Sequence, residues 1–218
     1  MQELIDDGVK VDMILTDPPY LINYHTGLRS DKSHKLAQPI LNDNNPQLIK
    51  DIVPLCYELL NEGSTFYCFC SEHYIDYFKQ VIQEYFTIKN ILIWVKRKGG
   101  GLGDLKGSYA SCNEFIIFAT KGRHLLNGGR DPNILYYNKV PNQNLLHSNQ
   151  KPINLLEYII GKSTDYNDLI LDCFMGSGST GVACLNTNRQ FIGIELDPEY
   201  YQIAKERCKS HQTKLEVH

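Results

Sequence analysis

Short apolar runs alternate along this chain with stretches in which apolar residues recur at helical spacing. Residues 11–16 are typical of a buried strand, and residues 48–61 are typical of a helix that stops at Asn61-Glu62-Gly63. The same reasoning predicts strands at 65–70, 88–96, 114–120, 169–174 and 190–195, and helices at 73–85, 152–160, 180–186 and 198–210. Strands that alternate with helices predict α/β layers around a mostly parallel sheet.

Three segments interrupt this alternation. Residues 21–47 and 121–150 are polar and lack periodicity, and residues 97–112 are rich in glycine. Loops of this length in a compact domain tend to be functional.

Length and composition fit one domain over residues 1–218. No apolar run approaches the roughly 20 residues that span a bilayer, and the N-terminus lacks the pattern of a signal peptide. The seven cysteines are scattered without the spacing of a zinc site. We therefore expect a cytoplasmic protein with reduced thiols, no membrane span and no metal.

The net charge of −3 does not advertise a nucleic-acid-binding protein, but the basic residues are grouped. Two stretches carry four cations each against one aspartate, and a local basic surface of this kind can bind a polyanion. The alternative is that both stretches are solvated loops. The cations are Lys96, Arg97, Lys98 and Lys106 in the first stretch, and Lys121, Arg123, Arg130 and Lys139 in the second.

An unusual tetrad, Asp17-Pro18-Pro19-Tyr20, follows the first predicted strand. Two prolines fix the backbone and remove two N–H donors, so the carbonyls of Asp17 and Pro18 can serve as acceptors. An ionised Asp17 only accepts hydrogen bonds, and Tyr20 offers a ring on which a base can stack. This surface suits an exocyclic amino group, although a simple strand-ending turn would look similar.

A glycine-rich turn, residues 172–180, lies between a predicted strand and a predicted helix. Gly176 and Gly178 permit close approach to a ligand, and an acid, Glu195, ends the next predicted strand about 20 residues later, which is the spacing of nucleotide-binding folds. We expect Ser177, Ser179 and Thr180 to cap the helix. The Gly-x-Gly-x-x-Gly pattern that starts at Gly176 leaves a dehydrogenase as an alternative, although its place near the C-terminus argues against one.

Together these motifs resemble the amino-methylating DNA methyltransferases that use S-adenosylmethionine. The order of tetrad before glycine turn matches their permuted (beta) arrangement, and the resemblance covers nearly the whole chain. The matching stretches are Asp17-Pro18-Pro19-Tyr20, Leu60-Asn61-Glu62-Gly63-Ser64, EFIIFATKG at 114–122, HSNQKP at 147–152, Phe174-x-Gly176-x-Gly178 and GIELDPEY at 193–200.

The resemblance implies a Rossmann-like class I methyltransferase fold with one antiparallel strand and helices on both faces. It implies catalysis by Asp17, Pro18, Pro19 and Tyr20 on a base that leaves the DNA stack. It assigns the cofactor to Asp172, Phe174, Gly176, Ser177, Gly178, Ser179, Thr180, Glu195, Lys151 and Pro152. The basic residues of both stretches would meet phosphates, and residues 121–147 form a short candidate target-recognition segment. DNA is the expected partner, and a homodimer and a cognate restriction enzyme are compatible with the family.

An aspartate-led tetrad is commoner in the adenine-N6 enzymes of the family, which makes adenine the expected base. Cytosine N4 presents the same amino geometry and is the close alternative. More distant alternatives are methylation of RNA or of a protein glutamine amide, a catalytically silent nucleic-acid-binding module, and an NAD-type oxidoreductase.

Overall fold

The computed structural model of the chain describes residues 1–20, 44–96, 106–107, 109–141, 143, 145–146 and 149–215. Its strands are β1 (Val11–Thr16), β2 (Leu60–Cys70), β3 (Thr87–Lys96), β4 (Asn113–Thr120), β5 (Ile134–Tyr137), β6 (Leu169–Asp172) and β7 (Gln190–Gly193). Its helices are α1 (Gln2–Asp6), α2 (Gln47–Leu59), α3 (Ile75–Ile82), α4 (Ile153–Ser163), α5 (Ser179–Asn186) and α6 (Pro198–Leu215). Within the described residues, no helix is both long enough and apolar enough to cross a membrane.

The seven strands form one sheet in the order β5-β3-β4-β2-β1-β6-β7. Strand β4 runs antiparallel to both of its neighbours, whereas the other pairings are parallel. The mostly parallel sheet with one antiparallel strand is therefore confirmed.

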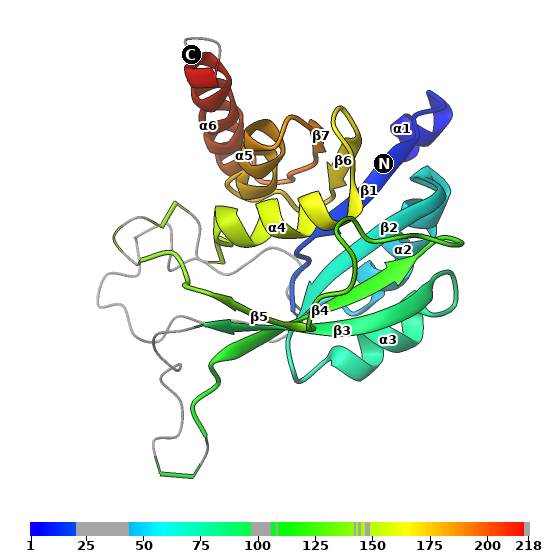
Figure 1. The fold of residues 1–218 in the computed structure, drawn as a ribbon, viewed down its shortest axis with the longest axis vertical. Helices are drawn as coiled ribbons and strands as arrows, with labels where there is room; N and C mark the ends of the chain where they lie inside the picture. The colour runs from blue at the N-terminus through cyan, green and yellow to red at the C-terminus, as the bar shows by residue number, and fades with distance from the viewer. Residues whose placement is uncertain are drawn as a thin grey trace.

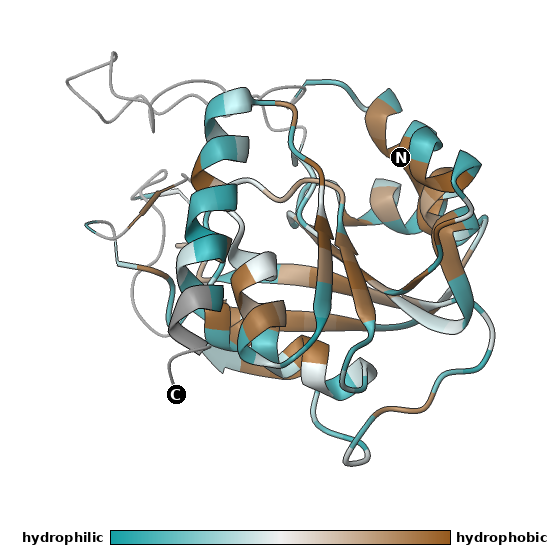
Figure 2. Ribbon diagram, turned by 90° about the horizontal axis from the view of Figure 1, so that it is seen from above, coloured by the Kyte–Doolittle hydropathy of each residue, from teal (hydrophilic) through white to brown (hydrophobic). Residues whose placement is uncertain are grey.

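Helices cover both faces of the sheet, as expected (Figure 1). The first core cluster packs apolar residues of α2 and α3 on one face, and the second packs those of α4 and α5 on the other. Alternate residues of β1 divide between these clusters: Ile14 belongs to the first, and Met13 and Leu15 belong to the second. Figure 2 shows the hydrophobic colour concentrated in the strands and the hydrophilic colour along α6.

The structure departs from the predicted elements in three places. Helix α1 and strand β5 were not expected, and β5 lies inside the segment that looked irregular. The predicted helix stop at Asn61-Glu62-Gly63 is wrong, because α2 ends at Leu59 and β2 begins at the next residue. Gly63 has a φ of +83° inside β2, where the register of β2 against β1 shifts between Val11 and Met13.

The topology gathers several chain segments at one edge of the sheet. The carboxyl ends of the parallel strands β1, β6 and β7 lie at this edge, and antiparallel β4 brings its first residues to the same edge. Helix α2, which follows β1, and helix α5, which follows β6, cover opposite faces. The ends of β1 and β6 therefore flank a topological switch point, the place where open α/β sheets bind ligands.

Candidate active site

The tetrad lies at the carboxyl end of β1, where Pro18 and Pro19 are buried and the Asp17 side chain is 18% exposed. The two oxygens of Asp17 differ sharply. Oδ2 accepts a hydrogen bond from Lys151 Nζ at 2.5 Å. Oδ1 is buried and has no hydrogen-bond partner among the described residues. The carboxylate is thus anchored through one oxygen, and no described residue uses the other as an acceptor.

Glu114, the second residue of β4, connects three side chains behind the tetrad. Its Oε2 lies 3.2 Å from Lys151 Nζ and accepts a hydrogen bond from the Tyr20 hydroxyl at 3.0 Å. Its Oε1 lies 2.6 Å from Lys96 Nζ. Asp17, Lys151, Glu114 and Lys96 form a continuous network of two carboxylates and two ammonium groups. Glu114 begins the EFIIFATKG stretch at 114–122, but the sequence assigned it no role in the site, because only the antiparallel direction of β4 brings it to this edge.

The network shifts the pKa values of its members in directions that follow from burial and neighbouring charge. Burial raises the pKa of Asp17, with Lys151 opposing and Glu114 adding to the shift. Burial would also raise the pKa of Glu114, but Lys151 and Lys96 outweigh it and lower that pKa. Burial would lower the pKa of Lys151, but its two carboxylate partners raise it. Lys151 therefore stays charged, and Asp17 is the carboxylate that protonates more readily.

Asp172, the last residue of β6, organises the glycine-rich turn. Its Oδ1 accepts from Thr16 Oγ1 and from the Phe174 backbone N–H, both at 3.1 Å, and its Oδ2 accepts from Thr180 Oγ1 at 2.6 Å. Burial raises the pKa of Asp172 to about 6, against the effect of these hydrogen bonds. The bond from Thr16 spans β1 and β6, so the residue before Asp17 is tied directly to the turn.

Glu195 lies beside the turn, as the spacing predicted. Its Oε2 accepts from the Gly176 N–H at 2.9 Å and its Oε1 accepts from the Asp197 N–H at 2.9 Å. The Met175 N–H donates to the carbonyl of Ile194 at 3.0 Å. The turn and the end of β7 are therefore held together, and the Glu195 carboxylate lies against the backbone of the turn.

The helix caps expected from the hydroxyl residues are absent: Gly178 is the N-cap of α5, and no side chain caps it. Thr180 bonds Asp172 instead, and Arg207 of α6 donates to Ser177 O at 3.1 Å and to Ser179 Oγ at 3.2 Å. Gly178 has a φ of +78°, and a Cβ there would lie 2.9 Å from Ala204 Cβ. The left-handed backbone and the close approach of α6 both require a glycine at this position.

Lys151 was expected to enclose the cofactor together with Pro152, the N-cap of α4. Its ammonium instead donates to Asp17 and, at 3.4 Å, to the carbonyl of Asn149. It also lies 5.4 Å from the centroid of the Tyr20 ring. These contacts point to the tetrad. The preceding His147 and Ser148 lie outside the described residues.

The structure separates the basic residues that the sequence grouped together. Lys96 is paired with Glu114, and Lys121 donates to the carbonyls of Tyr57 at 2.7 Å and Leu60 at 2.8 Å. Lys121 and exposed Arg123 follow the carboxyl end of antiparallel β4, so they lie at the edge opposite the tetrad. Exposed Lys139 follows β5 and lies at the tetrad edge. Lys106 and Arg130 are exposed, and Arg97 and Lys98 lie outside the described residues.

The candidate recognition segment, 121–147, is partly built into the fold. Strand β5 pairs with β3, and Asn127 donates to the carbonyls of Gly161 and Thr164 at the end of α4. Asp131 lies 2.8 Å from Lys162 Nζ. Residues 142, 144 and 147 lie outside the described residues.

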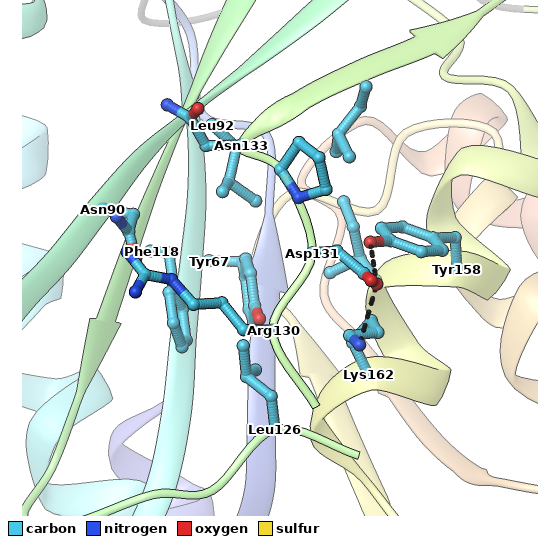
Figure 3. A pocket seen from close by; sticks show the side chains of 13 residues that line it. Tyr67, Asn90, Leu92, Phe118, Leu126, Arg130, Asp131, Asn133, Tyr158 and Lys162 are labelled. Atoms are coloured by element: carbon cyan, nitrogen blue, oxygen red, sulfur yellow. Dashed lines mark hydrogen bonds and ion pairs between the residues drawn. The ribbon is translucent and has the colours of Figure 1, made fainter. Parts of the chain in front are cut away.

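A cavity of about 480 Å³ lies between this segment, the sheet and α4 (Figure 3). Arg130 and Asn90 extend at one side, and Asp131 meets Tyr158 and Lys162 at the other. Its described lining includes no residue of the tetrad or of the glycine-rich turn. The cavity is therefore separate from the site at the sheet edge. In the described part of the chain, no group of three or more His, Cys, Asp or Glu residues is placed to hold a metal ion.

The Asp17-Pro18-Pro19-Tyr20 tetrad and the glycine-rich turn thus meet at the switch point of the sheet. The family described as DNA methylase (N6_N4_Mtase) matches residues 11–206, and the chain belongs to this family. The dehydrogenase alternative is thereby excluded.

The matches to individual relatives cover nearly the whole chain. Type II methyltransferase M2.MboI of Moraxella bovis is 30% identical to this chain, over 90% of this chain's length and 80% of its own length. The crystal structure of an M1.HpyAVI-SAM complex is 30% identical, with a TM-score of 0.73 over 95% of this chain and 93% of the other. The PvuII DNA methyltransferase (cytosine-N4-specific) has a TM-score of 0.72, and the match covers 95% of this chain and 87% of the other. At 15% sequence identity, this likeness shows the fold alone.

Proposed function

We propose that this chain transfers a methyl group from S-adenosylmethionine to the exocyclic N6 amino group of adenine in DNA. The observation that carries the proposal is the buried Oδ1 of Asp17, which has no hydrogen-bond partner among the described residues. Asp17 directly follows Thr16, whose hydroxyl bonds Asp172 of the glycine-rich turn. A buried acceptor without a partner is costly, and a bound amino group would satisfy it. Cytosine N4, which presents the same amino geometry, is the second candidate.

The residues around the turn fit the cofactor. Gly176 has a φ of +51°, and its N–H meets Glu195, which has acceptor capacity left for ribose hydroxyls. When bound, S-adenosylmethionine supplies a methyl group attached to a positively charged sulfur, and that sulfur becomes a neutral thioether when the methyl group is transferred. The residues that would hold the cofactor are Phe174, Gly176, Ser177, Gly178, Ser179, Glu195 and Pro152. Asp172 and Thr180 would shape the turn, because their polar atoms already bond one another.

The tetrad would prepare the amino nitrogen. Its lone pair is delocalised into the base, and hydrogen bonds from the amino group to Asp17 Oδ1 and to the Pro18 carbonyl would direct that lone pair outward. This is catalysis by positioning and electrostatic stabilisation. As the nitrogen bonds the methyl group it gives up one proton, which Asp17 Oδ1 would accept. The base must leave the duplex to reach the tetrad, and stacking on Tyr20 would contribute roughly 1–3 kcal/mol.

The choice of adenine is supported by the aspartate at the head of the tetrad, which is commoner among adenine enzymes of the family. The fold itself is shared with a cytosine-N4-specific enzyme and favours neither base. A second copy of this chain and a cognate restriction enzyme are further proposals that rest on the family alone. Analytical ultracentrifugation of the purified chain tests the first of them.

Incubation with labelled S-adenosylmethionine and duplex DNA of mixed sequence, followed by nucleoside analysis, tests the reaction and the base together. We expect N6-methyldeoxyadenosine, and we expect Asp17→Ala to abolish it while cofactor binding persists. N4-methyldeoxycytidine would establish the second candidate. Absence of any methylated nucleoside from a preparation that binds both the cofactor and DNA would contradict the proposal.

A further inference from the structure

Lys151 is buried, and each donor of its ammonium group faces an acceptor. Its side chain is 7% exposed, and its Nζ contacts Asp17 Oδ2, Glu114 Oε2 and the carbonyl of Asn149. An ammonium carries three N–H donors, so this set of contacts uses all three. Burying a lysine is costly unless anions accompany it, and here two carboxylates do. The arrangement leaves Lys151 no donor for a further ligand.

We propose that Lys151, itself held by Glu114, is a positioning residue that fixes the Asp17 carboxylate so that Oδ1 accepts the hydrogen bond of the target amino group. The inference rests on the proposed methyl transfer and concerns the same site. With Oδ2 held at 2.5 Å, the carboxylate cannot rotate without breaking a charge-assisted bond. The acceptor for substrate is thereby fixed before substrate arrives.

Glu114 extends this positioning to the base. The same oxygen that contacts Lys151 accepts from the Tyr20 hydroxyl, and Lys151 also lies near the Tyr20 ring. One carboxylate at the start of β4 therefore anchors the residue that aims Asp17 and the ring expected to stack on the base. Lys96 neutralises the second oxygen of Glu114, so the anchor does not depend on Lys151 alone.

The charges of Lys151 and Glu114 should affect how activity depends on pH, which a merely structural role would not do. Lys151 lowers the pKa of Asp17, whereas Glu114 raises it. The acceptor role needs Asp17 ionised, so activity falls as the pH drops through this pKa. Removing Lys151 should raise the pKa of Asp17 and so move the acid limb of the kcat–pH profile to higher pH. Removing the charge of Glu114 should lower that pKa and move the acid limb to lower pH. The other titratable groups around Asp17 are Tyr20, Cys68, Cys70 and Asp172.

The test compares Lys151→Met and Glu114→Gln with a matched control, Lys162→Met. Lys162 is also a poorly exposed lysine paired with an aspartate, Asp131, but it lies away from the tetrad. We expect Lys151→Met to lower kcat by about 100-fold, the usual scale for a misplaced catalytic group. Its affinity for S-adenosylmethionine, measured by calorimetry, should stay within about threefold of the wild type. Lys151→Arg should recover part of the rate, because it restores the charge.

Opposite displacements of the acid limb in Lys151→Met and Glu114→Gln, with an unchanged limb in Lys162→Met, would support the proposal. Wild-type kcat in Lys151→Met would overturn it. Loss of cofactor affinity with an unchanged kcat at saturation would also overturn it and make Lys151 a cofactor ligand. If Lys151→Met does not fold, the limb in Glu114→Gln decides alone, and a shift to higher pH or no shift overturns the proposal. An inactive wild type would instead contradict the proposed function.

Discussion

Tyr20 combines two properties that a single substitution can separate. We propose that its ring stacks on the base, and its hydroxyl donates to Glu114 at 3.0 Å. Tyr20→Phe keeps the ring and removes the tether, so we expect a loss of about tenfold in kcat, the scale of a hydrogen bond to a charged group. Tyr20→Ala should lose most of the activity, and Tyr20→Trp should keep part of it.

Single-turnover methylation of one duplex measures these rates. Tyr158→Phe is the matched control, because the Tyr158 hydroxyl also donates to a carboxylate, that of Asp131, at 2.9 Å. Its rate should equal that of the wild type. Equal rates in Tyr20→Ala and the wild type would show that the ring does not hold the base.

Asp172 gives the stability of the protein a pH dependence with a defined sign. Its pKa is about 6 in the folded protein against 3.8 for the free side chain, so the folded state binds its proton more tightly. The stabilisation by that proton is present at low pH and is lost as the pH rises through about 6. Relative to Asp172→Asn, the wild type should lose about 2 kcal/mol of unfolding free energy between about pH 4.5 and about pH 7.5.

Urea unfolding of both proteins at the two pH values measures this difference. The asparagine variant has the same shape and does not titrate, so other groups cancel in the comparison. A difference that stays constant, or that grows with pH, would contradict the assignment.

The residues that could be predicted from the sequence are those whose partners are near in the chain. The tetrad is contiguous, and Glu195 follows the glycine-rich turn at a characteristic spacing. Glu114 and Arg207 escaped prediction because each reaches its site through the packing of a distant element. The serine caps failed for a similar reason, since Arg207 of α6 donates to the Ser177 and Ser179 hydroxyls that were expected to cap α5.

At the scale of elements, the packing of α6 on the glycine-rich turn can be tested at Gly178. Gly178→Ala meets the left-handed backbone and a 2.9 Å approach to Ala204 Cβ. We expect a loss of about 2 kcal/mol in unfolding free energy, from backbone strain and overpacking together. Because the turn would shift, affinity for S-adenosylmethionine should fall as well.

Two further variants sharpen this test in urea unfolding and calorimetry. Gly161→Ala, in α4, meets no atom within 4 Å and should leave stability unchanged or raised. Ala204→Gly removes the Cβ contact, so Gly178→Ala should cost less in an Ala204→Gly background than in the wild type, with the double variant compared with Ala204→Gly alone. Full stability in Gly178→Ala alone would show that α6 does not constrain the turn.

The elements themselves followed the sequence closely where the apolar pattern was strong. Strand β1 has the predicted bounds, and most others differ by a few residues. Strand β5 was missed because it is four residues long, with one buried side chain, and takes its place through pairing with β3. Helix α2 and β2 meet without a turn. Gly63, which was predicted to stop the helix, instead lies inside β2 with a left-handed φ of +83°.

At the scale of the whole molecule, the direction of the strands decides which basic residues can share a surface with the tetrad. Lys121 and Arg123 are close in sequence to Arg130 and Lys139, but antiparallel β4 carries the first two to the opposite edge. Parallel pairing of β5 with β3 brings Lys139 to the tetrad edge, where Tyr137 aligns with Lys96. A surface inferred from charge grouping in the sequence is thus divided by topology.

The salt dependence of DNA binding tests this division. Each phosphate contact that is lost reduces the slope of log K against log salt concentration by about 1. We expect Lys139→Ala to reduce the slope by about 1 and to weaken binding to all sequences alike, because phosphate contacts do not read bases. Arg123→Ala removes the same charge from a position at the far edge that is also exposed, and it should leave the slope unchanged. Fluorescence anisotropy with one labelled duplex at a series of salt concentrations gives both slopes. A reduced slope in Arg123→Ala with an unchanged slope in Lys139→Ala would place DNA on the opposite edge, and the tetrad could then not reach the base.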